Sequence, residues 1–229
     1  MRRAAEMWLI EATRHNVLPF DDRGIERALP EFVGRPTLVK GNRQPLFGGM
    51  GRLSENSVVN IKNKSHAVTA EIVVPDGGAQ GVMVVQGGGI GGWSLQVRDG
   101  KPRYCYNLLG IQRFYVDADG EIPPATHQVR MEFAYEGGGL GKGGAVELFV
   151  EGDIVGKGTV TATAAMVFSA DDTCDVGKEG GALVADDYPV PNDFTGQINW
   201  VEIDVAEAAE NTDQLISPEE RLRIAMARQ

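Results

Sequence analysis

The chain is poor in the residues that metal and redox sites use most often. Its 229 residues include two cysteines, Cys105 and Cys174, and three histidines. Two cysteines allow at most one disulfide, which excludes a small disulfide-stabilised scaffold. The histidines, His15, His66 and His127, are isolated in the sequence and form none of the short paired motifs that bind zinc. We expect ordinary surface or edge positions for these side chains, and a metal-binding or acid–base role is the alternative.

Long apolar runs and clustered positive charge are also scarce. No stretch approaches the roughly 18 to 20 uninterrupted apolar residues of a membrane helix. The 22 Lys and Arg residues face 32 Asp and Glu residues, so the formal net charge is −10. Neither a membrane nor a nucleic acid is therefore expected as a partner. Met1-Arg2-Arg3 is followed by Glu6 and Glu11 rather than by the apolar stretch of a signal peptide, and the sequence leaves the localisation open.

Apolar residues recur at every second position through the middle of the chain. The alternation is clearest in the segments 68–74, 93–98, 128–135 and 146–151. It places one row of side chains in a core and the other toward water, as in half-buried antiparallel strands. Tight reversals are expected at Asp99-Gly100 and at Glu151-Gly152-Asp153. The sequence therefore predicts a mainly β protein, an antiparallel β-sandwich or jelly roll.

Helical patterns stand at both ends of the chain. Residues 2–16 contain good helix formers, no Gly or Pro, and apolar residues at three- and four-residue spacing. The tail from Ser217 begins with an N-cap serine, proline at the first helical position and glutamate at the third. We therefore expect a helix with an extended linker at 1–51, the sandwich at 52–205 and a helical tail at 206–229.

Aspartates gather between residues 171 and 193. Loops of sandwiches often supply clustered carboxylates to calcium, which prefers about six to eight oxygen ligands. Solvated turn residues are the alternative, since the sequence has no EF-hand-type loop. The candidate calcium ligands are Asp171, Asp172, Asp175, Asp186 and Asp187.

Aromatic residues form a second candidate site. Tyr104, Tyr106, Phe114 and Tyr115 lie on neighbouring predicted strands. An exposed row of tyrosines could stack on sugar rings, because tyrosine has an apolar face and a polar tip. Packing in the core is the alternative. Tyr104, Tyr106 and Tyr115 are the candidate ligand-binding residues.

Six stretches carry a family resemblance and run in order over nearly the whole chain. They are WLIEATRHNVLPFDDR (8–23), NSVVNIKNKSHAVTAEIVVPDGGAQGVMVVQGG (56–88), GGWSLQVRDGKPRYCYNLLG (91–110), FAYEGGGLGKGG (133–144), VFSADDTCDVG (167–177) and LISPEERLRIAMARQ (215–229). Together they resemble the C-terminal region of long bacterial arylsulfatases of the formylglycine-dependent sulfatase family. The third stretch is also similar to concanavalin/laminin-G-like sandwiches, which implies that fold.

The resemblance implies no catalytic residue in this chain. Family members hydrolyse sulfate esters with a formylglycine made from the cysteine of a C-x-P-x-R motif, and with a calcium ion. Cys105 is followed by Tyr-Asn-Leu-Leu and Cys174 by Asp-Val-Gly-Lys, so neither lies in that motif. The resemblance therefore implies that the catalytic domain lies upstream of Met1.

Three hypotheses for the function follow. The leading one is a C-terminal accessory sandwich of an arylsulfatase, inactive alone, whose partner is the sulfatase catalytic domain or another copy of the chain. The alternative is a lectin-like module that binds sulfated glycan or another sugar. A third is a stand-alone jelly-roll glycoside hydrolase, which needs two carboxylates facing one groove. Glu132 and Glu147 lie on polar-facing rows and could supply them, although surface charge explains both equally well.

Overall fold

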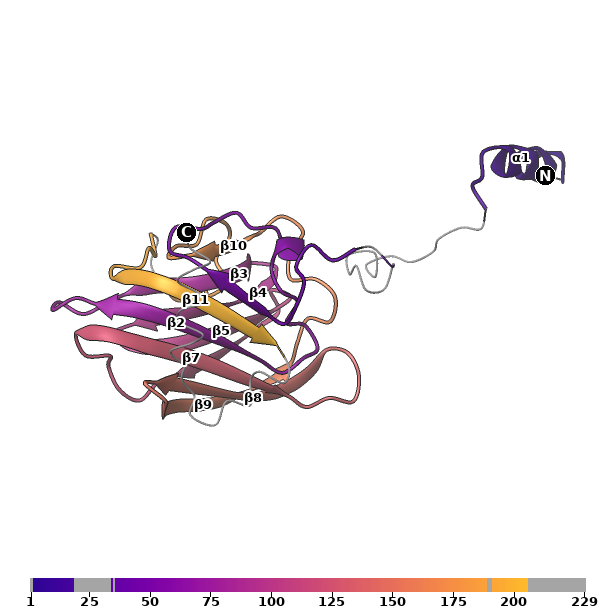
Figure 1. Ribbon diagram of the computed structural model, residues 1–229. Helices are drawn as coiled ribbons and strands as arrows, with labels where there is room; N and C mark the ends of the chain where they lie inside the picture. Colours follow the sequence, from indigo (N-terminus) through magenta and orange to yellow (C-terminus); the bar gives the residue numbers. More distant parts are fainter. Residues whose placement is uncertain (1, 19–33, 35, 189–190, 206–229) are drawn as a thin grey trace. The chain divides into compact units, whose positions relative to one another are not determined.

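The computed structural model describes residues 2–18, 34, 36–188 and 191–205. The chain divides into two compact units, residues 1–35 and residues 36–229. The first unit contains a helix and the second contains the β-sandwich (Figure 1). The predicted helical tail at 206–229 lies outside the described residues. The helices in the described ranges include none long and apolar enough to span a lipid bilayer.

Helix α1 (Arg2–Arg14) is two residues shorter than the segment 2–16 predicted as helical. It ends because Asn16 adopts a left-handed conformation with φ of 53°, and the N–H of Val17 bonds back to the carbonyl of Ala12. Ala12 is the buried residue of the helix. The large apolar side chains of α1 are exposed. They are Met7, Trp8, Leu9 and Ile10.

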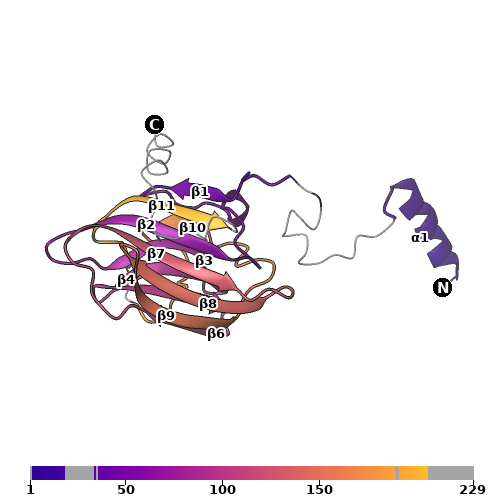
Figure 2. The ribbon, with the colours of Figure 1, turned by 60° about the horizontal axis from the view of Figure 1, so that its bottom comes forward.

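Within the described residues, eleven strands form two antiparallel sheets that stack as a sandwich (Figure 2). The six-stranded sheet has the order β1 (Arg43–Leu46), β11 (Gln197–Val205), β2 (His66–Val74), β7 (Ala125–Tyr135), β8 (Lys142–Val150) and β9 (Asp153–Ala162). The five-stranded sheet has the order β10 (Cys174–Val176), β3 (Gly81–Gly88), β4 (Gly91–Arg98), β5 (Lys101–Leu108) and β6 (Gln112–Asp117). A short 3-10 helix, η2, spans Glu55–Ser57. The mainly β antiparallel sandwich predicted from the alternation is confirmed.

The sandwich begins earlier than predicted. Residues up to 51 were expected to be linker, but β1 pairs with β11 from Arg43↔Asp204 to Leu46↔Val201. Strand β1 has a single apolar residue in a four-residue run, so its sequence has no period to detect. Pro45 is tolerated because β1 is the edge strand of its sheet, where a missing N–H breaks no ladder bond.

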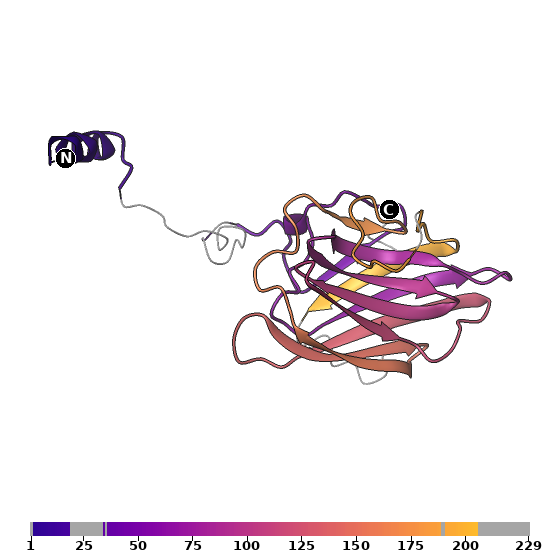
Figure 3. The same cartoon turned by 180° about the vertical axis from the view of Figure 1, so that it is seen from behind.

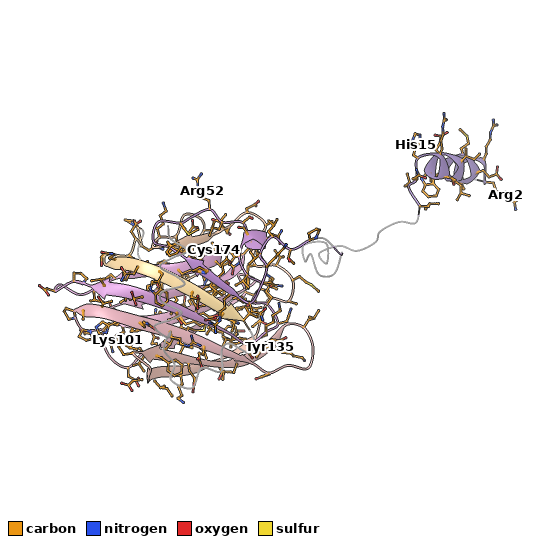
Figure 4. The ribbon with its side chains drawn as sticks, viewed as in Figure 1. Arg2, His15, Arg52, Lys101, Tyr135 and Cys174 are labelled. Atoms are coloured by element: carbon orange, nitrogen blue, oxygen red, sulfur yellow. The ribbon has the colours of Figure 1, made fainter. Side chains whose placement is uncertain are left out.

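The core lies between the two sheets, where side chains from both fill the space (Figure 4). Val68 and Ile72 of β2 are fully buried there, in one cluster with Trp93 and Leu95 of β4. Trp93 and Leu95 point inward, and the residues between and beyond them on β4 therefore point to the outer face of the five-stranded sheet. This alternation places Gln96 on that outer face.

The outer face of the five-stranded sheet is itself covered by chain. Val82, Val85 and Cys105 on this face form a buried cluster with Val184 and Ala185. We call residues 177–188, which supply the second half of that cluster, the covering segment. Figure 3 views the sandwich with the five-stranded sheet in front. This face, rather than the outer face of the six-stranded sheet, carries the candidate site.

Candidate functional site

Arginines from β4 and β5 hold the covering segment to the sheet. Arg98 Nη1 lies 2.7 Å from Asp187 Oδ2, and Arg103 Nη1 lies 2.6 Å from the same oxygen. Arg103 also pairs with Asp117 on β6, its cross-strand neighbour. Two cations on one carboxylate fix the position of Asp187 above the sheet, because charge-assisted hydrogen bonds are the stronger kind.

Strand β6 holds the same segment at Val184 and Asp186. Arg113 Nε donates to the carbonyl of Val184 at 2.7 Å, and its Nη1 lies 3.2 Å from Asp186. The hydroxyl of Tyr115 donates to Asp186 Oδ1 at 2.5 Å. This hydrogen bond, with the charge of Arg113, lowers the pKa of Asp186 although partial desolvation opposes the shift. The covering segment is therefore fastened by residues of three strands.

The five aspartates predicted as calcium ligands are engaged separately. Asp186 and Asp187 pair with arginines. Asp172 accepts a hydrogen bond from a serine hydroxyl at 3.0 Å, and Asp175 accepts one from a backbone N–H at 2.7 Å, while Asp171 is exposed. In the part of the chain that the structure describes, no three His, Cys, Asp or Glu side chains are placed to hold a metal ion. Calcium binding stays a prediction.

The predicted row of ligand-binding tyrosines does not exist as an exposed surface. Tyr104 is 0% and Tyr106 4% exposed, because both point into the core between the sheets. Neither ring can stack on a sugar from outside, which corrects that prediction. Tyr115 points to the other face, beside Cys105, and its hydroxyl is used to hold the covering segment. For Tyr104 and Tyr106, core packing was the right alternative.

The two carboxylates considered for glycoside hydrolysis are cross-strand neighbours. Glu132 on β7 pairs in register with Glu147 on β8. Glu132 Oε1 lies 2.8 Å from Arg130 Nε, and Glu147 Oε1 lies 2.6 Å from Lys157 Nζ. Each carboxylate thus has its own cation, as surface charges do.

A cavity of about 240 Å³ opens at one end of the covering segment. Its floor and one side come from the ends of β3 and β4, and its other side from residues 188 and 191–195. We call this cavity the groove. Its charged and amide-bearing lining residues are Gln80, Gln96, Arg98, Asp99, Asn192 and Asp193, and Tyr188 adds an aromatic ring.

Gln96 is the least exposed polar side chain of the groove. It is 2% exposed and lies on the outer face of the sheet between Val82 and Arg103, its neighbours on β3 and β5. Among the described residues, its Nε2 amide finds no hydrogen-bond partner. A buried donor left unpaired costs about 1 to 3 kcal/mol, so it is a strong candidate to be satisfied by a ligand atom or a water.

A single carboxylate holds one side of the groove. Glu179 accepts hydrogen bonds from the hydroxyl of Tyr188, from Asn192 Nδ2 at 3.0 Å and from the N–H of Val184 at 2.6 Å. Burial raises the pKa of Glu179 to about 7, since its loss of hydration outweighs these hydrogen bonds. Tyr188 and Asn192 therefore share one anchor, whose protonation changes near neutral pH.

The opposite side is held by hydrogen bonds from main-chain N–H groups to side-chain oxygens. The N–H of Asp99 donates to Gln80 Oε1, and the N–H of Gln80 donates to Thr195 Oγ1, both at 2.9 Å. Gly81 has a φ of +105°, and a Cβ there would stand 2.7 Å from the carbonyl of Asn192. Glycine is therefore required for residues 191–195 to approach β3 this closely.

Sequence reasoning missed most of the groove. In the sequence, Asp193 is distinguished only as part of the acidic stretch, and Gln96 is one polar residue of an alternating strand. Tyr188 and Glu179 lie in a stretch without strand or helix period. The available signal was the run Asp-Tyr-Pro-Val-Pro-Asn-Asp at 187–193, whose turn formers predict a loop that folds back rather than an extended linker.

Comparisons with known proteins show a likeness of fold. No protein-family model matches the chain, and no curated protein matches it. A sialidase CBM40 module from Ruminococcus gnavus, solved with alpha2,6 sialyllactose, is 15% identical, with a TM-score of 0.45 over 82% of this chain and 99% of the module. Mouse laminin alpha1 LG4-5 is 15% identical, with a TM-score of 0.43 over 72% of this chain and 39% of that one. Likeness this distant says nothing about ligand or activity, and the sulfatase resemblance stays a prediction.

Proposed function

We propose that the sandwich is a non-catalytic glycan-binding module whose binding site is the groove. The observation that carries this proposal is that Gln96 is one of the residues that line the groove, while its buried Nε2 amide has no hydrogen-bond partner among the described residues. The sequence analysis gave a glycan-binding module as its alternative, with a row of tyrosines as the binding residues. The binding residues proposed from the structure are Gln96, Tyr188, Asp99 and Asp193, and we call the last two the rim aspartates.

The groove offers hydrogen-bonding groups and an aromatic surface, both of which can bind a sugar. A sugar hydroxyl both accepts and donates hydrogen bonds, so one can accept from Gln96 Nε2 while others donate to the carboxylates of Asp99 and Asp193. The ring of Tyr188 supplies apolar surface beside them, and its hydroxyl is already held by Glu179. Small-molecule sites commonly combine a few placed polar groups with such surface.

The experiment is binding by the full chain on a glycan array, followed by calorimetry on the sugars that bind. Gln96→Met keeps the volume and removes the amide, and is expected to weaken binding about tenfold. Ser94→Ala is the matched control, since Ser94 is on the same strand and also has a buried unpartnered hydroxyl, but is not among the residues lining the groove. No glycan binding, or equal binding by Gln96→Met, would contradict the proposal.

A second candidate function is the accessory role beside a sulfatase catalytic domain. It is favoured by the exposed apolar side chains of α1, of which Ile10 is 65% and Leu9 56% exposed. Soluble proteins rarely leave a large contiguous apolar patch uncovered. A co-expressed catalytic domain of this family is expected to copurify with the full chain and not with Ile10→Glu. Turnover of a chromogenic aryl sulfate by the full chain alone would contradict the accessory role.

A further inference from the structure

We propose that the groove takes sugar units without sulfate or carboxylate groups, and that its rim carboxylates favour uncharged sugars and amino sugars. This inference rests on the proposed function and names the ligand class of the same site. The sequence left sulfated and other sugars open as alternatives. The charges around Gln96 distinguish them.

Arg98, the basic residue that lines the groove, already forms ion pairs with carboxylates of the protein. Arg98 Nη1 lies 2.7 Å from Asp187 Oδ2 and also donates to the main-chain carbonyl of Asp187. Its Nε lies 3.7 Å from Asp99 Oδ2. An anionic sugar would therefore meet a guanidinium whose charge two aspartates already share.

The anions of the rim are less well compensated. The Asp99 side chain is 88% exposed, with Arg98 as its distant partner. Asp193 is exposed, and among the described residues no Lys, Arg or His nitrogen lies within 4.0 Å of its carboxylate. Counting Arg98 against Asp99 and Asp193 leaves the lining of the groove with a formal charge of −1. The net charge of −10 on the whole chain adds to this repulsion of anions.

The polarity of the groove matches a polyol or an ammonium group. Gln96, one of the lining residues, carries an unpaired donor in Nε2, and the rim carries acceptors in Asp99 and Asp193. An uncharged sugar satisfies both with its hydroxyls. A protonated amine donates to the rim carboxylates with the added strength of a charge-assisted bond. A sulfate satisfies the floor alone and is repelled by the rim.

The test uses the full chain and two matched pairs of sugars: lactose with 3′-sulfolactose, and an N-acetylglucosamine hexamer with its de-N-acetylated form. Calorimetry at low salt is expected to show at least tenfold weaker binding of 3′-sulfolactose than of lactose. The deacetylated hexamer is expected to bind at least as tightly as the acetylated one. The difference between lactose and 3′-sulfolactose should shrink at high salt, because rim charges are exposed and screened.

Asp193→Asn should recover most of the lost affinity for 3′-sulfolactose. The control is Asp153→Asn, which changes the net charge equally at an exposed position at the start of β9. Equal recovery by Asp153→Asn would overturn the assignment to the groove. Tighter binding of 3′-sulfolactose than lactose, abolished by Gln96→Met, would overturn the ligand class and leave the glycan-binding function standing. No binding of any of the four sugars would overturn the ligand class, and no binding anywhere on the glycan array would overturn the glycan-binding function as well.

Discussion

The carboxylate of Glu179 accepts a hydrogen bond from Asn192 Nδ2 at 3.0 Å, and the N–H of Glu179 donates back to Asn192 Oδ1 at 3.3 Å. This reciprocal pair ties the start of the covering segment to the residues that follow Tyr188. The shape of the groove on that side depends on this pair, because Tyr188 bonds to the same carboxylate.

Glu179 should make the stability of the sandwich depend on pH. Its pKa is raised by burial to about 7 from an ordinary 4.5, so the folded state binds a proton more tightly than the unfolded state. Its stabilising contribution is complete below about pH 4.5 and is lost as the pH rises through about 7. Between pH 4.5 and pH 8 this group alone should lower the free energy of unfolding by about 3 kcal/mol.

The measurement compares urea unfolding of the wild type and Glu179→Gln at both pH values. Other carboxylates, such as Asp186 with its lowered pKa, contribute in both proteins and cancel in the difference. Glu136→Gln, at an exposed position, is the control and should keep the pH dependence of the wild type. An unchanged slope in Glu179→Gln would mean that its carboxylate titrates normally.

Removing Arg103 should expose the thiol beneath the covering segment. Arg103 holds Asp187, and Cys105 lies fully buried in the cluster between sheet and segment. Burial raises the pKa of the Cys105 thiol to about 12, so in the wild type it should react very slowly with a disulfide reagent. Arg103→Met is expected to lower stability by about 1 to 3 kcal/mol and to speed labelling of Cys105.

Cys174 is the internal control for this labelling. It is fully buried on β10, with its pKa also raised by burial, and it belongs to the core cluster instead. Peptide mapping of the labelled protein should find the reagent on Cys105 and not on Cys174. Equal labelling of the two would indicate global unfolding rather than release of the covering segment.

Gly81 should tolerate no side chain. Gly81→Ala forces φ of +105° on an L residue and places a methyl group against the carbonyl of Asn192, so a loss of about 2 to 4 kcal/mol is expected. Gly77→Ala, with nothing within 4 Å of the added Cβ and no left-handed φ, should change the free energy of unfolding by less than about 1 kcal/mol. Chemical denaturation of both variants checks the difference.

The strands and turns could be predicted from the sequence because the conformations of neighbouring residues in the chain determine them. Asp99 and Gly100 have φ of 49° and 75°, and Glu151 and Gly152 have φ of 52° and 87°. Positive φ at both central residues is what a tight two-residue hairpin turn requires, and the sequence placed reversals at these positions.

The site could not be read in the same way because it depends on which face is covered. Period two assigns Tyr104 and Tyr106 to one face and Tyr115 with Cys105 to the other. It does not say which face lies against the second sheet. Residues 177–188 cover the outer face of the five-stranded sheet, and this segment has neither helical nor strand period. A groove formed by such a segment has no characteristic residue spacing by which the sequence could reveal it.

A crystal structure of the full chain soaked with the tightest-binding sugar from the array tests directly whether the groove is the binding site. We expect a sugar oxygen within about 3 Å of Gln96 Nε2, with further hydroxyls at Asp99 and Asp193. A sugar bound on the outer face of the six-stranded sheet, or anywhere that leaves the Gln96 amide unpaired, would contradict this expectation.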